Sequence, residues 1–198
     1  MKKLTALIIP GVLLSLLCYC TNPFSTRSPE EPDPNAGQPT TGNNLQNTPD
    51  SVIAKIKLSF EQRNPQLYLD CLADPVRIGT FFVFFPEQDE AARLVNWMLS
   101  DEKQYFNNFV NSEDLLKVEL KDSVLSSFTT SLDTFRTEFI YKITAQFRTK
   151  TDRYQGRSIL GLLRASGDQL WYIYEWVDLR AGDETSDSTW STLKADYR

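Results

Sequence analysis

The sequence contains no histidine, and this absence narrows the chemistry that the protein can perform. Histidine is the usual general base near neutral pH and the commonest metal ligand in proteins. Only three cysteines are present, Cys18, Cys20 and Cys71, so neither a histidine-containing nor a four-cysteine zinc site can form. We therefore expect no metal site and no cofactor, and we assign no catalytic residue.

A strong positive charge is also absent. The formal net charge is −5, and nucleic acid is therefore excluded as an expected partner. The basic residues Arg148, Lys150, Arg153 and Arg157 form one cluster, relieved by an aspartate. This cluster could meet anionic lipid headgroups, but a charged and soluble hairpin tip is the simpler interpretation.

Residues 1–20 have the features of an export signal. Lys2 and Lys3 provide a positive start, and an apolar run follows from Leu4 to Leu17. A membrane-spanning helix needs roughly twenty apolar residues, so this run is short for a membrane span. It fits a secretory signal peptide instead.

The leader ends in LLCYC, and this ending resembles a bacterial lipoprotein leader, in which the cysteine after the cleavage site is lipidated. Leu17 lies three residues before Cys20, which favours Cys20 as the lipidated residue, with Cys18 as the alternative. The small residue that usually precedes the cysteine is missing at both positions. The resemblance implies a lipid-anchored protein of the bacterial cell envelope that faces the periplasm or the exterior. An ordinary signal peptide or an uncleaved anchor is the alternative.

Residues 21–48 are predicted to form a disordered tether. This segment holds half of the chain's prolines and almost nothing apolar beyond Phe24 and Leu45. Such a composition cannot bury enough surface to offset its ordering entropy. A tether directly after a lipidated cysteine would lift a folded domain clear of the bilayer.

Residues 49–198 are predicted to form a single α+β domain. Thr48 suits the N-cap and Pro49 the first position of a helix. The apolar stripe of this helix contains Val52, Ile56 and Phe60. The other predicted elements before and after the main strands are a short helix from Asn64-Pro65 to Asp74-Pro75, a short strand over Phe81–Phe85, a helical segment in one or two pieces over Glu87–Asn111, and a last helix with Trp190, Leu193 and Tyr197.

The strongest pattern lies in the second half of the domain. Apolar and polar residues alternate over Phe135–Phe147, which predicts a strand with one buried face. Further strands over Leu116–Leu120, Tyr154–Arg164 and Leu170–Leu179, joined by short polar turns, predict an antiparallel meander. The last strand is apolar on both faces, which indicates either a cover on both sides or a bulge midway.

This order of elements resembles the nuclear transport factor 2-like (NTF2-like) superfamily, which includes SnoaL-like proteins, ketosteroid isomerase and scytalone dehydratase. The resemblance covers about Thr48 to Leu179 and includes LYLDCLADP, FFVFF and the closing LWYIYEWVDL. It implies a cone-shaped α+β fold, in which a curved antiparallel sheet wraps around N-terminal helices and leaves a pocket at the wide end. Enzymes of the family often use an Asp–His or Asp–Tyr pair there, and the pair with histidine cannot exist in this chain.

Several aromatic residues are candidates for lining such a pocket, although aromatic residues at strand spacing more often belong to a core. These candidates are Tyr105, Tyr141, Tyr174 and Trp176, with Tyr172 beside them. Glu175 and Asp178 are candidate pocket acids, but a surface charge or a turn cap explains them more simply. Cys71 is interpreted as a small buried residue rather than a reactive thiol.

The leading interpretation is a lipid-anchored, non-enzymatic envelope protein whose domain binds a small apolar ligand or a protein partner. One alternative is an isomerase or dehydratase that uses Asp and Tyr for proton transfer. Another is a structural protein that assembles as a homodimer. An enzyme requires a carboxylate and a tyrosine hydroxyl facing an enclosed cavity, a ligand binder requires the cavity alone, and a structural protein has its cone filled by its own side chains, for example by the Trp190 helix.

Overall fold

The structure is a computed structural model, and it describes residues 46–182 and 188–198. All of the described residues belong to one compact unit. The predicted signal peptide, with Cys18 and Cys20, lies outside them, as does the predicted tether up to residue 45. At the end of the tether segment, the Gln46 side chain is buried and its amide donates to the backbone oxygens of Asp70 and Trp171.

The helices that start at Pro49 and Pro65 begin where the sequence signals predicted, whereas Asp74-Pro75, which was predicted to end a helix, starts another one. Helix α2 covers Pro49–Glu61, and the Thr48 hydroxyl accepts a hydrogen bond from the Ser51 amide at its N-terminus. Asn64 caps α3 and Asp74 caps α4 in the same way, each directly before a proline. The bounds are α3 Pro65–Asp70, α4 Pro75–Ile78, the 3-10 helix η3 Gln88–Glu90, α5 Leu99–Val110 and α6 Trp190–Asp196.

A five-stranded sheet in the order β1-β5-β4-β3-β2 forms the second layer. Its strands are β1 Val83–Phe85, β2 Leu115–Ser131, β3 Thr134–Phe147, β4 Thr151–Arg164 and β5 Trp171–Leu179. Strands β2 to β5 form the predicted antiparallel meander, and β1 adds to β5 in parallel. The sheet is therefore mixed, whereas the sequence predicted an antiparallel sheet.

Strand β5 contains a bulge at Tyr174. Ile173 pairs with Leu162 and Glu175 with Gly161, so Tyr174 is left without a partner residue. The extra residue shifts the alternation, and both Ile173 and Trp176 are fully buried. This bulge explains why the strand is apolar on both faces in the sequence.

The segment before α5 departs from the helix that was predicted, in one or two pieces, over Glu87–Asn111. Only η3 and α5 are helical, and the residues between them form turns in which Asn96 has a φ of 54°. A left-handed residue interrupts a helix. Leu94 and Trp97 are nevertheless buried, so their helix-like spacing in the sequence has a different structural origin.

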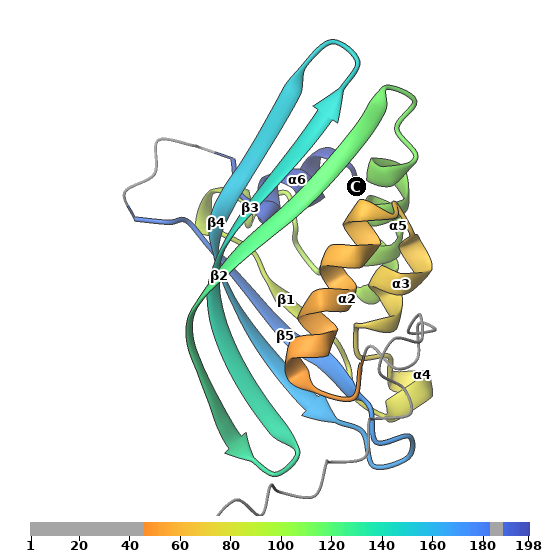
Figure 1. Cartoon of the computed structure of the whole chain (residues 1–198), viewed down its shortest axis with the longest axis vertical. Coiled ribbons are helices and arrows are strands. Elements are labelled where there is room, and N and C mark those ends of the chain that lie inside the picture. Colours follow the sequence, from red (N-terminus) through yellow and green to blue (C-terminus); the bar gives the residue numbers. More distant parts are fainter. Residues whose placement is uncertain (1–45, 183–187) are drawn as a thin grey trace, which may run out of the picture. The chain divides into compact units, whose positions relative to one another are not determined.

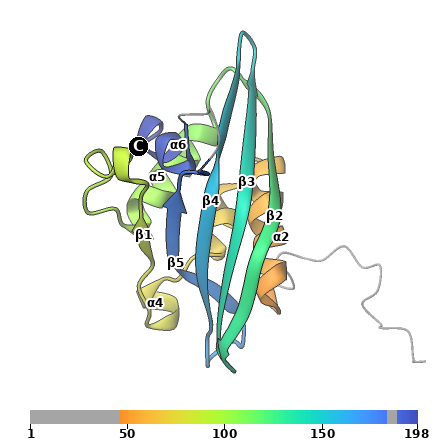
Figure 2. The same cartoon turned by 90° about the vertical axis from the view of Figure 1, so that its left-hand side faces the viewer.

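Three helices cover one face of the curved sheet. Figure 1 shows α2, α3 and α5 on this face, with α6 near one end. Helix α6 contacts α5, β4 and η3, and Figure 2 shows it beside α5. Among residues 46–182 and 188–198, no helix is both long and apolar enough to cross a membrane.

Candidate functional site

Trp190 of α6 lies in the centre of the space between the sheet and the helices. Its side chain is fully buried, with ring centroids 5.4 Å from Phe60 of α2, 5.1 Å from Tyr141 of β3 and 4.5 Å from Trp176 of β5. The three contacts are edge-on, which is the favourable arrangement of aromatic pairs. The indole Nε1 also donates to the Tyr105 hydroxyl at 3.0 Å. Helix α6 thus fills the interior of the fold.

The structure brings together three of the four predicted pocket residues. Tyr105, Tyr141 and Trp176 are all fully buried, and each contacts Trp190. Tyr174 lies apart from them, because it is the bulged residue of β5 and its ring packs against Gly161. The three inner residues line a space that the chain's own C-terminal helix occupies.

An aspartate–tyrosine pair is present and holds α6 in place. The Tyr141 hydroxyl donates to Asp178 Oδ1 at 2.7 Å, and it accepts from the Trp190 amide at 2.6 Å. Asp178 Oδ2 accepts from the amide and the hydroxyl of Ser191, at 2.7 and 2.6 Å. Gly156 makes room for this arrangement, because a Cβ there would come within 2.5 Å of the Tyr141 hydroxyl. The hydrogen bonds that Tyr141 and Asp178 make beyond the pair therefore hold the start of α6.

The burial of Asp178 opposes the ionisation of its carboxyl group, whereas its hydrogen-bond donors favour ionisation. Burial raises the pKa of the carboxyl, while the donors from Ser191 and Tyr141 counteract that shift. The interpretation of Asp178 as a surface charge is wrong, because the side chain is fully buried, and its hydrogen bonds to Ser191 instead cap the start of α6. Glu175, the other candidate acid, pairs with Arg136 at 2.7 Å and is partly exposed.

A second polar group inside the fold is an ion pair between Lys194 of α6 and Glu102 of α5. Both side chains are fully buried. Glu102 also accepts from the Tyr68 hydroxyl at 2.8 Å and from the Trp97 indole at 2.7 Å. Burial lowers the pKa of the Lys194 ammonium, and the charge of Glu102 opposes that shift. The carboxylate is thus fully engaged by three donors.

Little free space is left beside Trp190. A cavity lined by residues of α2, the sheet and α6, including Trp176 and Trp190, has a volume of about 10 Å³. Such a volume corresponds to about one water molecule, whereas ligand pockets usually measure about 300–1,000 Å³. This cavity is too small for a substrate, and neither Asp178 nor Tyr141 lines it.

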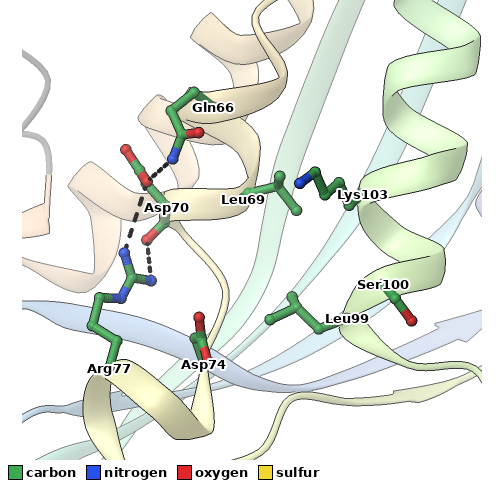
Figure 3. Close-up of a pocket in the computed structure, with 8 residues that line it drawn as sticks. All are labelled: Gln66, Leu69, Asp70, Asp74, Arg77, Leu99, Ser100 and Lys103. Atoms are coloured by element: carbon green, nitrogen blue, oxygen red, sulfur yellow. Dashed lines mark hydrogen bonds and ion pairs between the residues drawn. The ribbon is translucent and has the colours of Figure 1, made fainter.

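A larger hollow of about 370 Å³ lies on the surface between α3, α4 and α5. Figure 3 shows Asp70 between Gln66 and Arg77, with Lys103 on the opposite wall. The Gln66 amide donates to Asp70 Oδ1 at 2.6 Å, and Arg77 Nη1 lies 3.7 Å from the same oxygen. These charged groups pair with one another in an open hollow, unlike the apolar enclosed sites that small ligands prefer. We assign no ligand to it.

Within the described residues, no group of three or more histidine, cysteine, aspartate or glutamate residues is arranged to hold a metal ion.

The basic cluster at the β3–β4 hairpin is paired in part, with Arg148 near Asp114, Lys150 near Asp152 and Arg157 near Glu138.

Comparison with solved structures identifies the fold. An NTF2-like superfamily protein from Salmonella enterica matches with a TM-score of 0.50 and 14% identity, covering 74% of this chain and 96% of that one. A candidate scytalone dehydratase from Novosphingobium aromaticivorans matches with a TM-score of 0.53 and 5% identity, covering 71% and 87% of the two chains. No protein-family model and no curated protein matches the sequence. The chain has an α+β NTF2-like fold, as its order of elements predicted.

The amino-acid pattern does not predict the buried ion pair between Glu102 and Lys194, because charged residues in amphipathic helices usually face solvent. One feature of the sequence does indicate that Lys194 is buried. Lys194 lies four residues after Trp190 and one after Leu193, so it shares the helix face that the apolar residues define.

Cys71 provides a test of the packing around α3. Its side chain is fully buried, and burial raises the pKa of the thiol to about 12 from an ordinary value of 9.0. We predict that iodoacetamide at pH 8 leaves Cys71 unmodified in the native protein and modifies it in denaturant, as peptide mass spectrometry would detect.

The same pKa shift predicts the sign of a pH effect on stability. Above pH 9 the unfolded chain loses the thiol proton while the folded chain keeps it, so the free energy of unfolding falls as pH rises toward 12. Relative to Cys71→Ala, the decline should be steeper by about 1.4 kcal/mol per pH unit. Equal slopes for the two proteins, or rapid native labelling, would contradict the buried position.

Proposed function

We propose that the protein is a lipid-anchored envelope protein whose NTF2-like domain acts without catalysis, by binding a protein partner on its surface. The observation that carries the proposal is the insertion of Trp190 into the space between sheet and helices. In this fold the interior is where a ligand or substrate would be enclosed. Because α6 fills it, the outer surface is left as the means of recognition.

The enzyme alternative receives less support from the same geometry. The Asp178 and Tyr141 side chains are buried and 2.7 Å apart, as a proton-transfer pair would be. Their remaining hydrogen bonds go to Trp190 and Ser191 of α6. A general base must come within hydrogen-bonding distance of its substrate. The cavity of about 10 Å³ beside Trp190 is too small to admit one, and it is not lined by Asp178 or Tyr141.

The partner that we propose is a second copy of this chain, bound along β2. This strand forms one edge of the sheet and continues to Ser131, well beyond the part that helix α2 covers. From Ser123 to Ser131 every side chain is exposed, including those of Val124, Leu125 and Phe128. An exposed edge that carries large apolar side chains and, from Ser123 to Ser131, no lysine or proline invites pairing with another strand. Two identical edges related by a twofold axis can pair with each other.

Lysine substitutions on this edge should separate such a dimer. We expect the mature protein to sediment as a dimer at micromolar concentration and the Val124→Lys, Phe128→Lys double variant to sediment as a monomer with an unchanged circular dichroism spectrum. Val76→Lys is the control, because Val76 is 95% exposed on α4, away from this edge. A monomeric wild-type protein, or a double variant that still forms dimers, would reject the β2 interface.

The proposed anchor has a separate test. We predict that the protein partitions into the detergent phase and that Cys20→Ser moves it to the aqueous phase. Cys71→Ser is a control that keeps the leader intact. Release by Cys18→Ser instead would place the lipid on the alternative cysteine. Aqueous partitioning of the unmodified protein, or no release by either substitution, would refute lipid anchoring while leaving the surface-binding proposal untouched.

A further inference from the structure

The side-chain nitrogen of Lys194 lies among aromatic rings that come from separate parts of the chain. The Nζ atom is 3.6 Å from the ring centroid of Phe84 in β1 and 4.5 Å from that of Trp176 in β5. Tyr105 of α5 lies at 5.6 Å, and two more rings lie at 5.9 Å, those of Phe82 and Trp97. Rings within about 6 Å of a cation attract it through their electron-rich faces.

A single carboxylate, that of Glu102, completes the group of side chains around the Lys194 ammonium. Glu102 contacts the Lys194 ammonium and is itself held by donors from Tyr68 and Trp97, so its orientation is fixed from the helix side. Both charged side chains are 0% exposed. We call Phe82, Phe84, Trp97, Glu102, Tyr105 and Trp176 the ammonium cage. These six residues belong to β1, α5, β5 and the loops beside them, and none belongs to α6.

The ammonium cage is therefore formed by residues outside α6 and is occupied by the Lys194 side chain of α6. A fixed carboxylate recognises the charge of an ammonium group, and the surrounding rings favour a cation with an alkyl chain. The occupying group is the end of a straight four-carbon chain that carries a primary amine. The site's chemistry does not require that this chain be attached to α6.

We propose that the ammonium cage is a binding site for small primary alkylamines, which the protein fills with its own Lys194. The inference goes beyond the proposed surface function and does not depend on it. In the wild-type protein Lys194 occupies the site, so added amine should not bind there. The part of the Lys194 side chain beyond Cβ has the size and charge of n-propylammonium, so its removal leaves a vacancy that this ion fits.

The experiment uses the full-length chain with Lys194→Ala and follows its thermal unfolding as n-propylammonium chloride is added. We expect the midpoint to rise by about 3–5 °C for each tenfold increase in amine above its dissociation constant, because the ligand binds only the folded chain. Equal concentrations of n-propanol, which has the same shape without the charge, should leave the midpoint unchanged. If the variant does not fold alone, the expected result is that the amine, and not the alcohol, restores a cooperative transition.

Lys55→Ala is the matched control. Lys55 is also buried, at 1% exposure, but its Nζ contacts the Gln46 side-chain oxygen at 2.7 Å and Asp70 at 3.5 Å instead of a ring of aromatic faces. We expect no rise for this variant or for the wild-type protein. The proposal is overturned if n-propylammonium has no effect on Lys194→Ala, if n-propanol acts equally, or if Lys55→Ala responds to the same extent.

Discussion

Trp190→Ala should lower the free energy of unfolding by about 3–5 kcal/mol, which is the usual cost of truncating a fully buried tryptophan. The substitution removes three aromatic contacts and the hydrogen bond to Tyr105. It also leaves a cavity at the centre of the fold, because the surrounding rings belong to four different elements that cannot all move inward. Urea unfolding followed by circular dichroism measures the loss.

Phe81→Ala is the matched control for this prediction. Phe81 is also a large aromatic residue, but it is 71% exposed. Surface substitutions usually change the free energy of unfolding by no more than about 0.5 kcal/mol. If Trp190→Ala cost as little as Phe81→Ala, helix α6 would not be packed into the interior, and the argument for surface recognition would lose its basis.

Glu102→Gln should destabilise the protein by about 3–5 kcal/mol, because it leaves the buried Lys194 ammonium without a counter-charge. The double variant Glu102→Gln, Lys194→Met should recover a large part of that loss, since a buried ion pair can often be replaced by neutral side chains at little cost. Urea unfolding of the wild-type, both single variants and the double variant gives the coupling energy between the two residues.

The pH dependence of Glu102→Gln has a predictable sign. Burial lowers the pKa of Lys194, so between that lowered value and 10.5 the unfolded chain binds more protons than the folded chain. The free energy of unfolding then increases as pH rises through this range. Without Glu102 the pKa falls further and the increase starts at lower pH. The same pH dependence in the double variant, which has no Lys194, would show that another group is responsible.

The sequence predicts the strands of this sheet to different extents. Strand β3 could be predicted from its alternation, because Tyr141, Ile143 and Ala145 are buried while Lys142 faces solvent. The second half of β2 was missed because both of its faces are exposed, so no alternation marks it. Its pairing with β3 is what makes it a strand.

Inside the fold, the sequence identified the aromatic residues but not what they surround. Tyr105, Tyr141 and Trp176 could be recognised as apolar positions, and a filling role for the Trp190 helix was one of the alternatives. Which alternative holds depends on contacts between residues such as Tyr141 and Trp190, 49 positions apart. Periodicity carries no information about such contacts. The burial of Lys194 and Glu102 was hidden for the same reason, because each is stable inside only in the presence of the other.

The most direct test of the central claim, that the chain fills its own interior, is to compare native and denatured masses of one preparation from the protein's own host. The Cys18→Ser, Cys20→Ser form avoids detergent, and covalent modifications appear in both spectra and cancel. We predict that the native mass equals the denatured mass, or twice that mass for a dimer, with no bound small molecule. A reproducible stoichiometric adduct that is lost on denaturation would mean that the interior accepts a ligand and is not filled by the chain itself.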